Sequence, residues 1–192
     1  MLFRSAPKPR SSQPWLHQSG EEIQEFGTVR QFPVGLSYDT RMYSCQRLNQ
    51  VLCDTRILHD LYKKHHWLMR GHTFYQLHLL FDEHAKAQYE LVDKISERIQ
   101  QLGGIALGDP RHVAEHTSIE RPADGAEAPP VLMSRLLEAH EAIIVKAREV
   151  AAAVEDEDRT TDDLLSSEVL PVNELQVWFV AEHLVEVPLV DA

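Results

Sequence analysis

Two long helical patterns, interrupted by a single glycine, constrain the fold of this chain more than any other feature. In residues 40–70, apolar side chains recur at three- and four-residue steps, which is the spacing of one helix face. Gly71 breaks the pattern, and a second helix is expected over residues 72–102, ending at the pair Gly103-Gly104. Long helices joined by a brief break are typical of an antiparallel pair in a bundle.

The starts of the helices carry recognisable capping residues. Asp39 or Thr40 is expected to cap the first helix, since both side chains can accept a hydrogen bond from a free backbone N–H. The long connection over residues 103–130 contains "DPRHVAEH", which predicts a short helix with Asp109 as its cap and Pro110 at its first position.

Two further helices are expected in the second half of the chain. Residues 131–155 carry an apolar stripe, and residues 173–186 form a last helical pattern before Pro188. Four helices with one long crossover between the second and third predict an all-α fold, a ferritin-like four-helix bundle with a short extra helix in that crossover.

The N-terminal segment differs in composition from the rest of the chain. Residues 1–36 are rich in proline, serine and glutamine, with prolines at Pro7, Pro9, Pro14 and Pro33. Such a segment buries too little apolar surface to fold alone, so we expect a flexible arm over residues 1–36 and the bundle over residues 37–192.

Composition favours a cytoplasmic protein with no membrane segment. No run approaches the roughly 20 apolar residues that span a bilayer, and the basic N-terminus lacks the apolar core of a secretory signal. The two cysteines, Cys45 and Cys53, form no metal-binding motif and predict no disulfide framework; their role stays open. The net charge of −11 opposes nucleic-acid binding over most of the surface.

Metal-ligand side chains gather on one face of the second expected helix. His78 and Asp82 are four positions apart, as are Asp93 and Glu97, so all four lie within an arc of roughly 100°. The helix rises roughly 16 Å between Asp82 and Asp93, whereas a metal–ligand bond spans about 2 Å. The pairs therefore form either two separate half-sites or a site that a second copy of the helix completes across a two-fold axis.

His66, at the end of the first expected helix, can supply another imidazole to a site of this kind. Two histidines and three carboxylates suit iron or manganese and also admit zinc. In the competing interpretation the carboxylates belong to a solvated helix face and lie near Lys86, Lys94 and Arg98.

This stretch resembles the signature of the Dps family, the starvation-induced mini-ferritins. The residues that carry the resemblance are His66-Trp67, Gly71, Leu77-His78, Asp82, Asp93, Glu97-Arg98 and Leu102-Gly103-Gly104. The segments "LYKKHHW", "FYQLHLLFD" and "NELQVWF" are similar to the DpsA-type branch of cyanobacteria and haloarchaea. The helical pattern that goes with the signature extends from residue 36 to the end of the chain.

The resemblance implies a hollow shell of twelve subunits with ferroxidase sites at two-fold interfaces. His66, His78 and Asp82 of one subunit would join Asp93 and Glu97 of its partner. Such proteins bind iron, oxidise Fe(II), usually with hydrogen peroxide, and store Fe(III) as mineral, which protects against oxidative damage. Zinc is an alternative occupant of the same site.

Further roles follow only from the resemblance. His65 and His183 are candidate additional ligands, with a surface or supporting histidine as the alternative. Asp162 and Asp163, and with less support Asp158, are candidates for a pore at the three-fold axis through which iron enters. A plain solvated loop is the alternative for this acidic segment.

DNA binding is the alternative function that the resemblance raises. DNA-binding relatives usually use lysine-rich tails, whereas this arm offers only Arg4, Lys8 and Arg10. Twelve arms multiply weak contacts, so a weak DNA interaction stays open. We expect a ferroxidase and iron store, with a nucleoid-compacting protein as the alternative.

Overall fold

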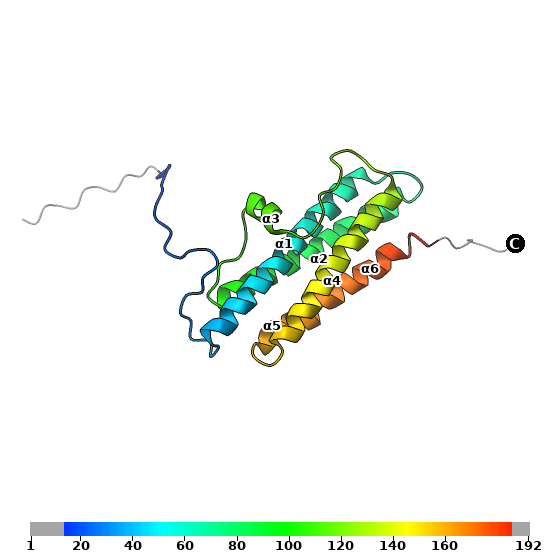
Figure 1. The fold of residues 1–192 in the computed structure, drawn as a ribbon. Helices are drawn as coiled ribbons and strands as arrows, with labels where there is room; N and C mark the ends of the chain where they lie inside the picture. Colours follow the sequence, from blue (N-terminus) through cyan, green and yellow to red (C-terminus); the bar gives the residue numbers. More distant parts are fainter. Residues whose placement is uncertain (1–13, 186–192) are drawn as a thin grey trace, which may run out of the picture.

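The helices of this chain pack as two antiparallel pairs (Figure 1). The computed structural model describes residues 14–185, and no described helix is long and apolar enough to cross a membrane. In chain order the helices are α1 (Tyr38–Leu68), α2 (Phe74–Gln101), α3 (Pro110–His116), α4 (Pro129–Val154), α5 (Arg159–Leu164), the π-helical η1 (Leu165–Val169) and α6 (Leu170–Ala181). This confirms the predicted all-α, ferritin-like bundle with a short helix in the crossover.

Helix α1 has a different cap from the predicted one. Ser37 has an extended backbone with ψ 160°, and its hydroxyl accepts a hydrogen bond from the Thr40 backbone N–H at 3.0 Å. Asp39 and Thr40 already lie in the first turn of the helix. A capping residue needs a non-helical backbone, so the prediction of Asp39 or Thr40 as the cap is wrong.

The pair Gly103-Gly104 ends the second long helix, as predicted. Gly103 has a φ of +86°, which favours glycine, and its N–H donates to the Gln100 carbonyl at 2.9 Å. The Gly104 N–H donates to the Ile99 carbonyl at 3.0 Å, so both free carbonyls are satisfied. A Cβ added to Gly104 would lie 2.5 Å from Cys45 Sγ, which shows how closely α1 packs on this turn.

The crossover helix begins at the predicted position. Asp109 caps α3 by accepting a hydrogen bond from the Arg111 N–H at 2.9 Å. After α3 the chain is fastened to α1 through the buried Asp54 carboxylate. That carboxylate accepts hydrogen bonds from the Thr117 hydroxyl and the Ser118 N–H, both at 2.7 Å.

The fourth long helix starts before the last predicted helical pattern, residues 173–186. It begins at Arg159 rather than near Asn173, and it ends at Ala181. The helix contains the π-helical segment Leu165–Val169 just before Pro171. Proline lacks an N–H and crowds the turn before it, so the wider π turn lets one helix continue through this position.

Part of the segment predicted as an arm lies against the end of the bundle. The Arg30 N–H donates to the Gly103 carbonyl at 3.0 Å, and the Gln24 side chain donates to the same carbonyl at 2.9 Å. The buried Arg41 guanidinium donates to the Arg30 carbonyl at 2.7 Å. Arg4, Lys8 and Arg10 lie outside the described residues, and the flexible arm and its boundary stay predictions.

Both cysteines are free thiols buried on α1. Burial raises the pKa of Cys45 and of Cys53 to about 11, so neither thiol is a reactive thiolate at neutral pH. This agrees with the predicted lack of a disulfide framework.

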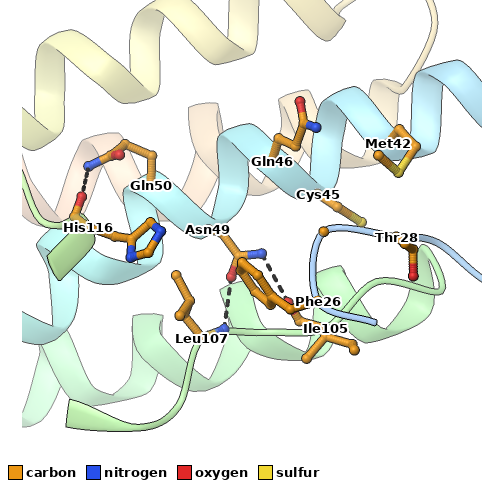
Figure 2. A pocket seen from close by; sticks show the side chains of 11 residues that line it. Phe26, Thr28, Met42, Cys45, Gln46, Asn49, Gln50, Ile105, Leu107 and His116 are labelled. Atoms are coloured by element: carbon orange, nitrogen blue, oxygen red, sulfur yellow. Dashed lines mark hydrogen bonds between the residues drawn. The ribbon is translucent and has the colours of Figure 1, made fainter. Parts of the chain in front are cut away.

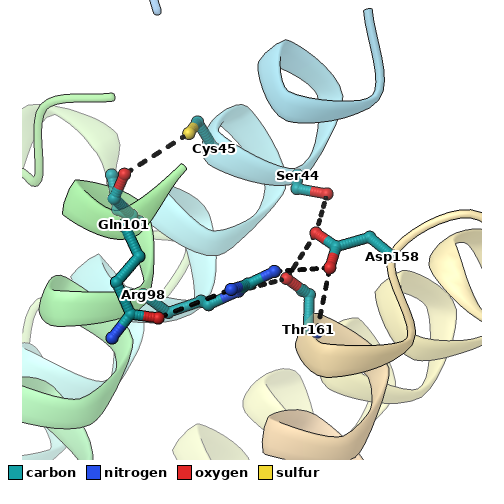
Figure 3. A network of polar contacts seen from close by, with 7 residues as sticks. Ser44, Cys45, Arg98, Gln101, Asp158 and Thr161 are labelled. Carbon is teal, nitrogen blue, oxygen red and sulfur yellow. Dashed lines mark hydrogen bonds and ion pairs between the residues drawn. The ribbon is translucent and has the colours of Figure 1, made fainter. Parts of the chain in front are cut away.

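A buried ion pair joins three helices at the Asp158 end of the bundle (Figure 3). Asp158 is 1% exposed, and one of its carboxylate oxygens lies 2.5 Å from Arg98 Nη2. The other oxygen accepts hydrogen bonds from the Ser44 hydroxyl at 2.8 Å and the Thr161 hydroxyl at 2.6 Å. The network therefore holds α1, α2 and the start of α5 together.

Asp158→Ala should destabilise the protein by about 3–5 kcal/mol, because it leaves the largely buried Arg98 guanidinium without its counter-charge. Urea unfolding followed by circular dichroism measures this change. Asp156→Ala removes an exposed neighbouring carboxylate and is the matched control. Equal unfolding midpoints for the two variants would contradict a stabilising role for the ion pair.

Candidate metal centre

Two of the predicted ligands meet where α1 turns into α2. The rings of His66, near the end of α1, and His78, near the start of α2, stack with centroids 3.7 Å apart and an interplanar angle of 17°. Gly71, with a φ of +89°, lies in the connection that reverses the chain between the antiparallel helices α1 and α2. The chain reversal thus places two imidazoles side by side.

Each imidazole is held by the backbone of the other residue. His66 Nδ1 lies 2.6 Å from the His78 carbonyl, and His78 Nδ1 lies 2.9 Å from the His66 carbonyl. A carbonyl oxygen only accepts hydrogen bonds, so each Nδ1 must carry a hydrogen. Neither Nε2 has a hydrogen-bond partner among the described residues, which leaves both with the orientation and tautomer of metal-binding histidines.

The third predicted ligand, Asp82, forms ion pairs with two lysines. Lys63 Nζ from α1 lies 2.5 Å from one carboxylate oxygen, and Lys86 Nζ, one turn further along α2, lies 2.7 Å from the other. Hydrogen bonds from Lys63 and then Lys86 hold the pKa of Asp82 well below its usual range. Two ammonium groups therefore surround the carboxylate that is expected to bind a cation.

The remaining carboxylates, Asp93 and Glu97, are exposed further along α2. Neither makes an ion pair within the described part of the chain, because their basic neighbours are turned elsewhere. Lys94 Nζ pairs with Glu168 of η1 at 2.7 Å, and Arg98 belongs to the network of Figure 3. Over residues 14–185 of one chain, no three histidine, cysteine or acidic side chains converge into a metal site.

The two candidate additional ligands, His65 and His183, have different surroundings. His65 is fully buried, neither ring nitrogen has a hydrogen-bond partner among the described residues, and burial lowers its pKa to about 4. His183 lies just beyond the end of α6, is exposed, and has its Nδ1 2.7 Å from the Phe179 carbonyl. The ligand roles of both histidines stay predictions.

The candidate pore residues fall into two groups. Asp158 is buried and fully engaged in the Arg98 network, so in this chain it acts as a structural cap of α5. Asp162 accepts a hydrogen bond from the Ser166 hydroxyl at 2.8 Å, while the exposed Asp163 accepts one from the Ser167 hydroxyl at 3.0 Å. Asp162 and Asp163 thus remain the better candidates for a pore.

A polar cluster in the bundle core and the contact of Lys63 with Asp82 were not predicted from the sequence. The hydroxyl of the buried Tyr62 lies 2.6 Å from His140 Nε2 and 3.1 Å from His84 Nδ1, and His140 Nδ1 lies 2.8 Å from Asn173 Oδ1. The one sequence signal was a histidine, His140, on the apolar stripe of α4. The other contacts join residues far apart in the chain, so the spacing of residues along the sequence does not predict them.

Comparisons with known proteins agree with this architecture. The family model described as "Ferritin-like domain" matches residues 45–190. A protein of Kitasatospora aureofaciens, described as an uncharacterized protein in the bpoA2 5' region, is 60% identical over 144 residues, covering 75% of this chain and 96% of that protein. A nutrient stress-induced DNA-binding protein of Synechococcus is 30% identical over 153 residues, covering 79% of this chain and 87% of that protein.

Solved structures show the same fold. DpsC from Streptomyces coelicolor superposes with a TM-score of 0.88 at 66% identity, covering 89% of this chain and 100% of that chain. An archaeal Dps homologue from Halobacterium salinarum superposes with a TM-score of 0.85 at 24% identity, covering 90% of this chain and 96% of that chain. The fold and the matched domain define a ferritin-like protein. Within that class, the chain belongs to the Dps family.

Replacing both Lys63 and Lys86 by methionine should raise the pKa of Asp82 toward its usual range, because both ammonium donors are lost while the aliphatic stems remain. Infrared titration of protein with isotope-labelled aspartate measures this shift, as the difference between the spectra of the double variant and of wild type. Lys94→Met is the control, since Lys94 pairs with Glu168 and not with Asp82.

The direction of the pH effect follows from the depressed pKa of Asp82. The stability that the two ion pairs contribute is present above the pKa of the unfolded state and is lost as the pH falls through the lower folded-state pKa. An Asp82 titration that is identical in wild type and the double variant would show that the lysines do not control this carboxylate.

Proposed function

We propose that this chain is a ferroxidase and iron store that oxidises Fe(II), with hydrogen peroxide as the oxidant, and holds Fe(III) as mineral inside a hollow shell of twelve copies. The reciprocal hydrogen bonding of His66 and His78 carries the proposal, because it fixes both tautomers and leaves two Nε2 lone pairs for a metal. Membership of the Dps family supports it. A Dps structure from Vibrio cholerae is itself described as one of the ferritin-like diiron-carboxylate proteins.

The proposed site is shared between two copies of the chain. His66, His78 and Asp82 of one copy would face the partner's Asp93 and Glu97 across a two-fold axis that crosses α2. The separation of about 16 Å along the helix keeps the two groups apart within one chain. The exposure of Asp93 and Glu97, and their lack of ion pairs in the described part of the chain, support this arrangement.

The donor set suits the proposed chemistry. Carboxylate oxygens with imidazole nitrogens favour iron, although the same set admits zinc. Anionic carboxylates stabilise Fe(III) more than Fe(II), which favours oxidation. Two Fe(II) ions at one site supply both electrons that convert hydrogen peroxide to water, so no radical is released. Lys63 and Lys86 balance the charge of Asp82 until iron displaces them.

Iron reaches the interior in this proposal through a pore at the three-fold axis, where Asp162 and Asp163 of neighbouring copies attract Fe(II). Protection of DNA then follows from the removal of iron and peroxide. One relative, from Halobacterium salinarum, is named a DNA protection during starvation protein. The net charge of −11 favours this indirect protection over direct contact with DNA.

A mixing experiment tests whether the site is shared. One inactive variant carries His78→Ala with Asp82→Ala, and the other carries Asp93→Ala with Glu97→Ala. A mixed two-fold dimer collects all four substitutions in one site and leaves the other intact. Equal amounts refolded together form mixed dimers about half the time, so about a quarter of the wild-type Fe(II) oxidation rate should return.

The measurement is ultraviolet absorbance of Fe(III) after anaerobic Fe(II) loading and addition of peroxide. Each variant refolded alone is the control for residual activity, and size exclusion confirms that the shells assemble. Assembled mixtures that oxidise no faster than the separate variants would contradict a site shared between chains.

A further inference from the structure

A fully buried tyrosine occupies the middle of the bundle, on the same helix as the predicted ligand His66. Tyr62 is 0% exposed, and its hydroxyl lies between two imidazoles that come from other helices. His140 Nε2 of α4 is 2.6 Å from the phenolic oxygen, and His84 Nδ1 of α2 is 3.1 Å from it. The proposed ferroxidase chemistry does not use this cluster.

The direction of the hydrogen bond between Tyr62 and His140 can be deduced. The Asn173 amide nitrogen donates to the Val169 carbonyl at 2.7 Å, which fixes the orientation of the amide and makes its oxygen the acceptor toward His140 Nδ1 at 2.8 Å. His140 Nδ1 therefore carries a hydrogen and Nε2 carries a lone pair. The Tyr62 hydroxyl must donate to His140 Nε2, so the phenolic proton points at a basic nitrogen.

The proton of Tyr62 stays in place while the residue is in its resting state. Burial raises the pKa of the Tyr62 phenol well above its usual value and lowers the pKa of His140 to about 3. Transfer between the two neutral groups would create a charge pair inside an apolar core, which is unfavourable. Loss of an electron changes this balance, because a phenol radical cation is a strong acid and gives its proton to a hydrogen-bonded imidazole.

The cluster lies close to the proposed ferroxidase site. Tyr62 stands one helical turn before His66, which is a rise of roughly 6 Å along α1. Its ring also contacts Phe81, with centroids 5.6 Å apart, and Phe81 directly precedes Asp82. The cluster is therefore linked to two predicted ligands, to His66 along α1 and to Asp82 through Phe81.

We propose that Tyr62 is an electron donor to the ferroxidase site, with His140 as the acceptor of its proton. A second electron is needed when hydrogen peroxide reacts at a site that holds one Fe(II) instead of two, because one Fe(II) supplies only one of the two electrons. Fe(II) and Tyr62 then lose one electron each, and hydrogen peroxide gains both electrons and two solvent protons to become two waters. The proton of Tyr62 moves to His140 Nε2, and a neutral phenoxyl radical remains in the core, so no hydroxyl radical escapes.

This inference rests on the proposed function, and the experiment separates the two. Wild-type protein receives one Fe(II) per site and then one equivalent of hydrogen peroxide, and samples are frozen for electron paramagnetic resonance. A phenoxyl signal that narrows when the protein contains ring-deuterated tyrosine is expected. It should weaken when two Fe(II) ions occupy each site.

Variants assign the radical to one residue. Tyr62→Phe keeps the ring but removes the hydroxyl, and it should abolish the signal and raise the yield of spin-trapped hydroxyl radical. The matched control Tyr38→Phe changes an exposed tyrosine at the first position of α1, at least about six helical turns from Tyr62, and should leave both readouts unchanged. His140→Gln keeps a hydrogen-bond acceptor without the basic nitrogen, so the radical yield should fall while the protein stays folded.

Three results would overturn the inference. The first is the absence of a tyrosine radical in labelled wild type although Fe(III) forms, and the second is a signal that survives Tyr62→Phe. The third is an indole radical from Trp67 instead of a tyrosine radical. If no Fe(III) forms, the proposed function fails instead. Pulse radiolysis with azide radical, which needs no iron, then decides the role of Tyr62. A phenoxyl component that is present in wild type and in Tyr38→Phe but absent from Tyr62→Phe supports the role of Tyr62. Identical traces in all three proteins refute it.

Discussion

The reciprocal hydrogen bonds between His66 and His78 are the contact on which the account of this protein depends. They link the end of α1 to the start of α2 and at the same time set the tautomer of both imidazoles. At the opposite end of the same helix pair, Gly104 packs against Cys45 too closely for any side chain. The hairpin of α1 and α2 is thus fixed at both ends, which holds the candidate ligand residues of α2 in defined positions.

Charge is arranged differently on the two sides of this hairpin. On the outer side, Lys63 and Lys86 form ion pairs with Asp82, while Asp93 and Glu97 are exposed. On the inner side, Tyr62 and His140 are neutral and fully buried. One short stretch of α1 therefore contributes both to the candidate metal site, where charged groups gather, and to a core cluster of neutral groups. In our account, the Tyr62–His140 cluster supplies an electron to the metal site and so prevents the release of a radical there.

Local pattern was enough to predict most of the fold. Helical periodicity, Gly71 and the Gly103-Gly104 pair defined α1 and α2, and Asp109 marked the start of α3. The part of the last helix before residue 173 was not evident from periodicity, because periodicity does not reveal a π-helical segment that lets a helix continue through Pro171. The cap of α1 was missed because Ser37 lies before the apolar pattern begins.

The candidate site was predictable in its spacing but not in its surroundings. Four-residue steps predicted the ligand face of α2. The adjacent His65 and His66 look alike in sequence, yet one is buried and the other stacks on His78, because helix rotation decides which side chain faces the core. Lys63 and His140 act through contacts between helices far apart in the chain, which spacing within one helix cannot show.

Iron-edge anomalous diffraction from crystals of the assembled protein, loaded anaerobically with Fe(II), tests the central claim most directly. The account predicts anomalous peaks at the two-fold interface, bound by His66, His78 and Asp82 of one copy and by the partner's Asp93 and Glu97. Asp82 should then have moved away from Lys63 and Lys86. Iron bound within a single chain, or an unchanged Asp82–lysine contact with iron located elsewhere, would contradict it.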